Sequence, residues 1–269
     1  MYFIDYHTHS ELSPDSSSPL LENAKNAVAA GLSELCITDH FDVLTEDGQF
    51  QDLAVLNWEE RVRQHGAVKS AMEGKLVLKL GIELGSGHED EAITNRILNH
   101  PELDFVIGSL HNMPKAAGGY DYYNTKYTST QQCYELLDHY FHSMAELVED
   151  DRYDVLGHII VMRRYMTVRD HQEFSFDRYM DQIRAILKGA IAHGRGIEFN
   201  TWCARSIEEW QDVLKLYHEL GGEFITVGSD AHVPRLIGKG VREAYEFLQS
   251  LGFRYVTTYE KRKPTQIKI

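Results

Sequence analysis

The sequence is poor in cysteine and has no long hydrophobic run, and each absence excludes a class of protein. Its 269 residues hold only three cysteines, Cys36, Cys133 and Cys203, which are far apart and lie in no CxxC motif. This spacing excludes a disulfide framework and predicts reduced, mostly buried thiols. No apolar run approaches the ~20 residues that cross a bilayer, and the first residues contain no secretory signal. We therefore expect a cytoplasmic protein without a membrane partner.

Positive charge is scarce as well. The chain has 27 Lys and Arg residues against 41 Asp and Glu residues, and its formal net charge is -14. Nucleic-acid polymers and anionic membranes are bound by cationic surfaces, so this balance argues against both partners. It does not argue against a small phosphate ester, because divalent ions bound at one site would supply positive charge locally. The oligomeric state is left open by the sequence.

Short β-branched or aromatic runs alternate with amphipathic stretches along the whole chain. This alternation predicts βα units around a parallel sheet, an α/β fold of seven or eight strands. No linker or repeat suggests a boundary, so we expect a single domain of residues 1–269. The expected strands are 2–6, 34–38, 76–82, 104–109, 153–157, 196–199, 224–228 and 253–257.

Helix signals fill the gaps between these runs. Ser18 and Pro19 predict a capped helix start, and Gly31 predicts its end. Apolar residues at helical spacing predict a helix over 133–148, and similar patterns predict helices over 179–193 and 207–220. The stretch 113–128 has no clear period and is the longest expected loop, a candidate lid over a site.

Ionisable side chains stand at or directly after the ends of the first seven expected strands. In a parallel βα barrel these ends share one face, where active sites are built. Histidine nitrogens and carboxylate oxygens without thiolates suit Zn²⁺, Mn²⁺, Fe²⁺ or Co²⁺. The nine candidate ligands are His7, His9, Asp15, His40, Glu83, His111, His158, Asp230 and His232. They exceed what one ion can use, so we expect two or three divalent ions.

These residues lie in motifs that resemble those of the PHP (polymerase and histidinol phosphatase) family, in matching order along nearly the whole chain. The motifs are His7-Thr8-His9 through Asp15, Ile37-Thr38-Asp39-His40, Gly81-Ile82-Glu83, Gly108-Ser109-Leu110-His111, Gly157-His158 and Gly228-Ser229-Asp230-Ala231-His232. Residues 198–201 followed by Arg205, and the ending 252–264, resemble the stand-alone histidinol-phosphatases of this family. The resemblance implies a distorted (β/α)7 barrel, similar to a TIM barrel, with a trinuclear metal site at the C-terminal face of the strands. It also implies hydrolysis of L-histidinol phosphate in histidine biosynthesis.

The resemblance further implies how the ligands are divided among three ions. His7, His9, Glu83 and Asp230 would hold the first ion, Glu83 with His111 and His158 the second, and Asp15, His40 and His232 the third. The sequence departs from the family pattern at Ser16, where many members have Gly, and at Ile160, where the phosphatase branch has Asp. The second departure removes a polar contact expected for the amino end of the substrate.

The expected reaction is attack on phosphorus by a hydroxide that bridges two ions and is held by Glu83, with Asp230 and His232 nearby. A water on the third ion or His232 is the candidate proton donor to the leaving alcohol. Arg163, Arg205 and Asn200 are the predicted substrate contacts, because Arg offers paired donors to phosphate. Arg164, Arg195 and Arg235 are their substitutes. Asp39 is predicted to orient a ligating histidine, and Glu198, like Asn200, to face the substrate.

Three other functions stay open at this point. One is a phosphoesterase of the same family that acts on nucleotides, DNA ends or other small phosphate esters. Another is a metal-dependent amidohydrolase, which usually carries a carbamylated lysine; no lysine ends an expected strand here. The last is a metal store or regulator, which does not explain an open rim of ligands.

Overall fold

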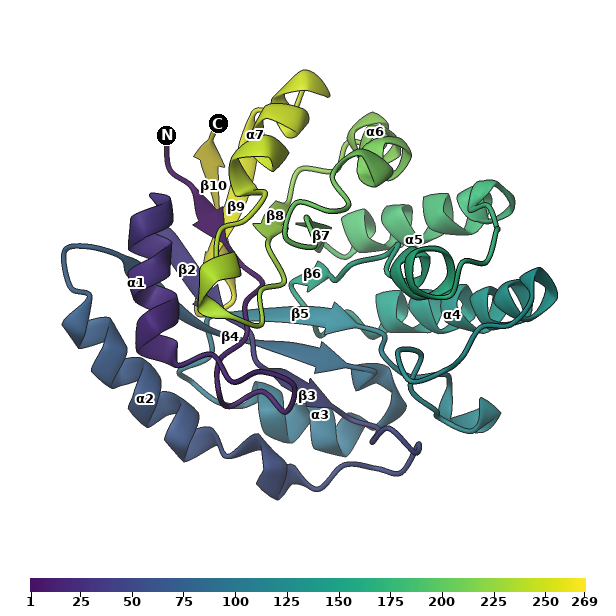
Figure 1. Cartoon of the computed structure of the whole chain (residues 1–269), viewed down its shortest axis with the longest axis horizontal. Helices are drawn as coiled ribbons and strands as arrows, with labels where there is room; N and C mark the ends of the chain where they lie inside the picture. The colour runs from purple at the N-terminus through teal and green to yellow at the C-terminus, as the bar shows by residue number, and fades with distance from the viewer.

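Seven parallel strands form a ring that is surrounded by helices (Figure 1). The computed structural model describes residues 1–269. The strands follow one another around the ring as β1 (Ile4–Asp5), β2 (Glu34–Ile37), β4 (Val77–Gly85), β5 (Phe105–Ser109), β6 (Val155–Leu156), β7 (Gly196–Asn200) and β8 (Ile225–Gly228). The short strand β3 (His40–Asp42) also pairs with β4. The Tyr6 amide donates to the Val227 carbonyl at 2.9 Å and joins the first strand to the last. The predicted distorted (β/α)7 barrel is confirmed.

The helices lie outside the ring and cover its strands (Figure 1). They are α1 (Leu20–Ala30), α2 (Trp58–Ala71), α3 (Glu91–Leu98), α4 (Thr130–Asp150), α5 (Met180–Ala192), α6 (Gln211–Glu219) and α7 (Val241–Ser250). The helices predicted over 133–148, 179–193 and 207–220 are confirmed as α4, α5 and α6. None of the helices is long and apolar enough to cross a bilayer.

The first helix begins differently from the prediction. Pro19, rather than Ser18, occupies the cap position of α1, and no side chain caps it from there. The Ser18 hydroxyl bonds the Asn23 side chain instead, and the Leu20 amide donates to Glu11 Oε2 at 2.6 Å. The predicted Ser18 cap is therefore wrong, because a more distant carboxylate satisfies the first free amide.

Aromatic side chains fill the lower part of the ring, at the N-terminal ends of the strands. Tyr6 and Phe105 meet edge to face at 4.9 Å, and Tyr259 packs on Phe105 at the same centroid distance. Burying such a ring stabilises the fold by about 1.5–3 kcal/mol. The three cysteines are buried and free, as predicted.

The chain ends in an antiparallel hairpin of β9 (Tyr255–Glu260) and β10 (Lys263–Lys268). The strand predicted over 253–257 thus exists, but it belongs to this hairpin and not to the ring. The Tyr259 amide donates to the Tyr6 hydroxyl at 2.8 Å, which ties the hairpin to the lower end of the barrel. The strand β10 was not predicted, because its residues are polar and mostly exposed.

The long loop 113–128 contains the short 3-10 turn η3 (Lys115–Ala117) and two isolated antiparallel bridges, from Tyr120 to Asp47 and from Asp121 to Asn112. It is tied to the π-helical turn η4 (Arg164–Arg169) and its end, because Arg169 donates to the carbonyls of Tyr123 and Thr125. Lys126 pairs with Asp170 at 2.6 Å. These contacts fix the loop in this structure, and its role as a lid stays a prediction.

Candidate metal centre

All nine predicted ligands lie together at the C-terminal ends of the strands, and we call this group the upper cluster. Each of the nine offers a nitrogen or oxygen atom within 4.8 Å of ligand atoms from at least two others. The strands impose this arrangement, because parallel strands end on one face. The contributing segments are the loop after β1 (His7, His9, Asp15), β3 (His40), β4 (Glu83), and the loops after β5 (His111), β6 (His158) and β8 (Asp230, His232).

Glu83 lies at the centre of the upper cluster and is fully buried. Its Oε2 atom is 3.0 Å from His7 Nε2 and 3.0 Å from His40 Nδ1. Its Oε1 atom is 3.1 Å from His111 Nε2 and 2.7 Å from His158 Nε2. One carboxylate therefore faces histidines from four different segments and would be available to any ion that these side chains hold.

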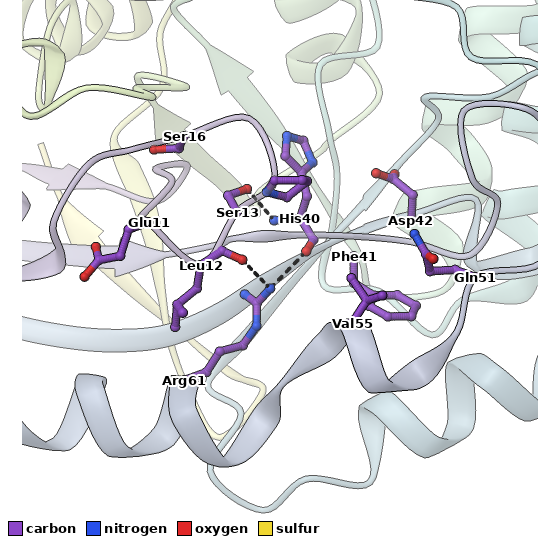
Figure 2. Close-up of a pocket in the computed structure, with 11 residues that line it drawn as sticks. Glu11, Leu12, Ser13, Ser16, His40, Phe41, Asp42, Gln51, Val55 and Arg61 are labelled. Atoms are coloured by element: carbon purple, nitrogen blue, oxygen red, sulfur yellow. Dashed lines mark hydrogen bonds between the residues drawn. The ribbon is translucent and has the colours of Figure 1, made fainter.

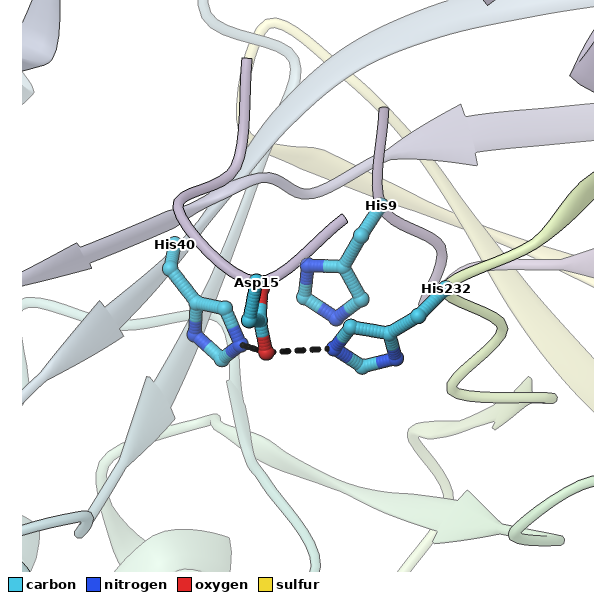
Figure 3. Close-up of side chains that lie close together, drawn as sticks. All are labelled: His9, Asp15, His40 and His232. Carbon is cyan, nitrogen blue, oxygen red and sulfur yellow. Dashed lines mark ion pairs between the residues drawn. The ribbon is translucent and has the colours of Figure 1, made fainter. Parts of the chain in front are cut away.

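A second set of side chains surrounds Asp15 at the outer edge of the upper cluster. Figure 3 shows the Asp15 carboxylate between the rings of His40 and His232. Asp15 Oδ2 is 2.9 Å from His232 Nε2 and 3.4 Å from His40 Nε2. The His9 ring packs against both of these imidazoles, at centroid distances of 4.3 Å from His40 and 4.1 Å from His232.

The donor atoms of the upper cluster fit divalent ions. The surroundings of His9 are the observation that tests this fit. Its Nε2 atom is buried and has no hydrogen-bond partner. It lies 3.5 Å from Asp230 Oδ1, which is 3.7 Å from His7 Nε2, and these three ligand atoms lie within 4.8 Å of one another. A buried polar atom without a partner costs about 1–3 kcal/mol. Nitrogen and oxygen donors of this kind are those that zinc, manganese and iron use.

The electrostatics of the upper cluster are strongly perturbed. Burial lowers the pKa of His7, but Glu198, Glu83 and Asp230 outweigh it and hold that pKa well above its usual range. Burial, with the neighbouring His40, lowers the pKa of His9 to about 3. The pKa values of these two neighbouring histidines are therefore shifted in opposite directions. Such opposed shifts mark functional sites.

Carboxylates outside the ligand set orient two of the histidines. Glu198 accepts from His7 Nδ1 at 2.7 Å, and Asp42 accepts from His111 Nδ1 at 2.6 Å. These bonds leave the Nε2 atoms pointing into the upper cluster, the arrangement that prepares a ligating histidine. Sequence reasoning missed Asp42, although it stands two residues after His40 on the same short strand.

Asp39 does not contact a histidine. It accepts from the Ser10 amide at 2.5 Å and the Ser10 hydroxyl at 2.7 Å, and it pairs with Arg61 at 3.2 Å. The predicted role of Asp39 is therefore wrong: it fixes the loop that carries the first ligands. Glu198 and Asn200 are fully buried rather than open to a substrate, and Asn200 Nδ2 donates to Glu198 at 3.0 Å. The predicted substrate contact of Asn200 stays a prediction.

The candidate arginines lie in different places. Arg164, named only as a substitute, pairs with Asp230 Oδ2 at 2.5 Å and also bonds the Asn200 side chain. Arg163 stacks over Phe176 instead, and Arg205 lies over Trp202. Arg195 pairs with carboxylates at the opposite end of the barrel, which removes it as a substrate contact. Arg235 is exposed.

A cavity of about 370 Å³ opens beside His40. Figure 2 shows Arg61 at its base, reaching the backbone oxygens of Leu12 and His40. These two bonds join the loop after β1 to the start of β3. Arg61 thereby holds two ligand-bearing segments in one position.

Comparison with known families gives one match that covers most of the chain. The family model described as "PHP domain" matches residues 5–202. The matched segment contains seven of the nine members of the upper cluster and ends before Asp230 and His232.

Curated relatives match over nearly their whole length. A histidinol-phosphatase of Lactococcus lactis subsp. lactis is 26% identical over 97% of this chain and 95% of its own. A probable histidinol-phosphatase of Clostridium acetobutylicum is 29% identical over 96% of this chain and 97% of its own. A crystal structure of histidinol phosphate phosphatase from Lactococcus lactis, complexed with zinc, L-histidinol and phosphate, superposes with a TM-score of 0.83. It is 25% identical and covers 98% of both chains.

Proposed function

The chain belongs to the PHP domain family, and on this basis we propose that it is a metal-dependent phosphomonoester hydrolase with L-histidinol phosphate as substrate. The products would be L-histidinol and phosphate, in histidine biosynthesis. Full-length relatives that are named histidinol-phosphatases support this choice of substrate. The solved relative that holds zinc, L-histidinol and phosphate supports both the metal and the ester.

The observation that carries the proposal is the environment of Glu83. Five histidines surround this buried carboxylate, and the Nε2 atom of one of them, His9, has no hydrogen-bond partner. Most buried polar groups in proteins are paired. We assign the nine members of the upper cluster as ligands of two or three divalent ions. The division of the ligands among the ions, and the identity of the metal beyond zinc, stay predictions.

Bound divalent ions would supply an activated water and would neutralise charge on the phosphate. The residues of the chain do the rest. Glu83 faces His7 and His40 through one oxygen and His111 and His158 through the other, so it holds the centre of the upper cluster together. Glu198 and Asp42 hold His7 and His111 in the required orientation. Phosphoryl transfer depends mainly on such positioning and charge neutralisation.

Arginines provide the remaining positive charge for the ester. Arg205 is exposed and makes no side-chain hydrogen bond or ion pair within the protein, so its donors are free for an anion. Arg164 lies against Asp230 at the inner side of the site. We assign Arg205 as a phosphate contact and keep Arg163 and Asn200 as predicted contacts. His232 remains the candidate donor of a proton to the leaving alcohol.

Four properties are supported by the sequence alone and stay predictions. They are a single domain of residues 1–269, a cytoplasmic location, no nucleic-acid polymer as partner, and no membrane as partner. A phosphoesterase of the same family that acts on nucleotides or other small phosphate esters is the nearest rival. No feature of the upper cluster favours an amidohydrolase, since Lys79, the lysine on β4, faces Glu260 of the hairpin at 3.9 Å.

The test is an assay of the purified chain against four substrates. These are L-histidinol phosphate, a mononucleotide, a phosphodiester and an N-acyl amino acid, each measured before chelation, after chelation and after Zn²⁺ or Mn²⁺ is restored. We expect the highest kcat/KM for L-histidinol phosphate, its loss on chelation and its return with metal. Activity that survives complete metal removal would contradict the metal-dependent reaction. Preference for the diester or the mononucleotide would assign the chain to the rival function.

A further inference from the structure

The turn after β7 has an unusual backbone. Trp202, Cys203 and Ala204 all lie in the left-handed region, with φ values of 44°, 53° and 70°. Residues with a side chain pay about 1–2 kcal/mol each for this region and normally adopt it singly. Three in succession, without glycine, form a costly turn that the surrounding structure must hold. Such strain collects at functional sites.

Hydrogen bonds from the strand ends hold this turn. The Trp202 amide donates to Asn200 Oδ1 at 2.9 Å, and the Cys203 amide donates to the Ser229 carbonyl at 2.8 Å. The first bond uses a side chain that also contacts Arg164, and the second joins the turn to the residue before Asp230. The turn is therefore fixed to the end of β7, which carries Asn200, and to the end of β8, which is followed by Asp230 of the upper cluster.

The turn places the Trp202 ring beside two arginines. The guanidinium carbon of Arg164 is 5.1 Å from the ring centroid, and that of Arg205 is 5.2 Å away. A cation within about 6 Å of an indole is attracted to it, most strongly where water is excluded. The Arg164 side chain is only 10% exposed, so its contact with the Trp202 ring is largely shielded from water and is correspondingly strong. Two like charges that would otherwise repel each other thus share one electron-rich ring.

The two arginines differ in what else holds them. Arg164 is fixed by Asp230 and Asn200 as well as by the ring. Arg205 has no other side-chain partner, so Trp202 alone restricts a long and flexible side chain. Ordering such a side chain in advance removes an entropy cost that binding would otherwise carry.

We propose that Trp202 is a positioning residue that holds Arg164 and Arg205 as a pair of guanidinium groups for the phosphate of the substrate. This inference rests on the proposed phosphatase function. It assigns a role to a side chain that touches neither the ligands of the upper cluster nor the reacting atoms. It also accounts for the strained turn, since the turn is what brings the ring beside the two arginines.

The test replaces the ring without relaxing the turn. Asn tolerates the left-handed region, so Trp202→Asn removes the ring and keeps the backbone, whereas Trp202→Phe keeps an aromatic face. Trp58→Leu is the control, because Trp58 stacks on His100 away from the site. Each metal-loaded variant is measured for kcat and KM with L-histidinol phosphate. The Kd of inorganic phosphate is measured directly by calorimetry, with the melting temperature as a check on folding.

We expect Trp202→Asn to raise KM and the Kd of phosphate about tenfold, with a smaller change in kcat. Trp202→Phe should recover most of this loss, and Trp58→Leu should resemble the unchanged protein. In an Arg205→Ala background, Trp202→Asn should have a much smaller effect, because part of its action passes through Arg205. A merely structural role would move the melting temperature and leave the Kd of phosphate unchanged.

Three results would overturn the inference. They are an unchanged Kd of phosphate in a folded Trp202→Asn variant, equal losses for Trp202→Asn and Trp202→Phe, or full additivity with Arg205→Ala. Absence of phosphomonoesterase activity in the unchanged protein would instead contradict the proposed function. In that case the calorimetric Kd still decides the inference, since it needs no turnover.

Discussion

The two ends of the barrel each bury a group of charged side chains, and the two groups differ in how their atoms are satisfied. The group at the N-terminal ends of the strands, here the lower cluster, consists of Glu34, Asp104 and Asp154. Glu34 accepts from the hydroxyls of Tyr2 and Tyr6, at 2.7 and 2.5 Å. Asp104 and Asp154 each accept a backbone amide of a neighbouring strand, and the hairpin of β9 and β10 supplies a second donor to each.

The upper cluster differs in its histidines. Ser109 donates to Glu83 at 2.7 Å and Arg164 pairs with Asp230, but histidine nitrogens remain unpaired. Its histidines and carboxylates face one another across Glu83, and both His9 Nε2 and His40 Nδ1 are buried without a hydrogen-bond partner. Each lower carboxylate accepts two hydrogen bonds from outside the group, although Asp154 Oδ1 has no hydrogen-bond partner of its own. A cluster that is left unsatisfied costs stability, so it is retained for what it binds. The comparison separates a structural group from a functional one within a single fold.

The largest expected effect is a loss of activity when a ligand of the upper cluster is replaced. His9→Gln should lower kcat by about 10³-fold or more, because losing one metal ligand removes several kcal/mol of transition-state stabilisation. The unfolding free energy of the metal-free protein should change much less, since His9 Nε2 has no partner to lose and Nδ1 loses only its 3.3 Å bond with Ser13. Steady-state kinetics and urea unfolding measure both. The exposed His142 on α4 offers the matched control, His142→Gln, and a similar loss of kcat there would undermine the assignment.

The next largest expected effect is a loss of stability when a partner of the lower cluster is replaced. Arg262→Ala should lower the unfolding free energy by about 2–3 kcal/mol, because it leaves the buried Asp154 carboxylate without its 2.5 Å guanidinium partner. kcat should not change. Arg254→Ala, at an exposed arginine next to the same hairpin, should stay within about 0.5 kcal/mol of the parent. If Arg262→Ala cost activity and no stability, the distinction between the two clusters would fail.

A third effect depends on pH and concerns His65, which lies near Asp104 of the lower cluster. Burial, with the neighbouring Lys69, lowers the pKa of His65 from 6.5 to about 4. The stabilising contribution is complete above pH 6.5, where His65 is neutral in both states. As the pH falls from 6.5 toward 4, only the unfolded chain takes up the proton, so the unfolding free energy drops by up to about 1.4 kcal/mol per pH unit.

Urea unfolding of chelator-treated protein between pH 7 and pH 4.5 measures this contribution. His65→Gln should remove it, so the difference between the two curves should shrink as the pH falls. Chelation is necessary because metal binding at the upper cluster is itself pH-dependent. Parallel curves would show that His65 is not responsible.

The smallest effect concerns substrate binding at the rim of the upper cluster. Arg205→Ala should raise KM about tenfold and change kcat much less than His9→Gln does, because Arg205 binds the phosphate in both the ground state and the transition state. Steady-state kinetics with L-histidinol phosphate measure the difference. An unchanged KM with a large loss of kcat would give Arg205 a role in the reaction step instead.

Much of the fold could be predicted because each ring strand is a short β-branched or aromatic run. The strand β3 could not, because His40 and Asp42 are polar and no apolar run marks it. The hairpin strand β10 was not predicted for the same reason. The lower cluster was not predicted either, since in sequence a carboxylate near the start of a strand cannot be distinguished from a solvated loop residue.

The ligands could be predicted because a parallel barrel brings strand ends together whatever their separation in sequence. The neighbouring residues that orient these ligands could not be predicted from the sequence. Whether Arg163 or Arg164 reaches the upper cluster depends on the π-helical turn that begins at Arg164, and no residue pattern marks that turn. The left-handed turn at Trp202 contains no glycine that would have indicated it.

The most direct test of the account is the metal content of the purified chain, measured by elemental analysis together with Asp230→Asn and Arg262→Ala. The account predicts two or three divalent ions per chain in the parent, fewer in Asp230→Asn, and the parent value in folded Arg262→Ala. A parent protein that binds no divalent ion, even after Zn²⁺ or Mn²⁺ is supplied, would contradict it.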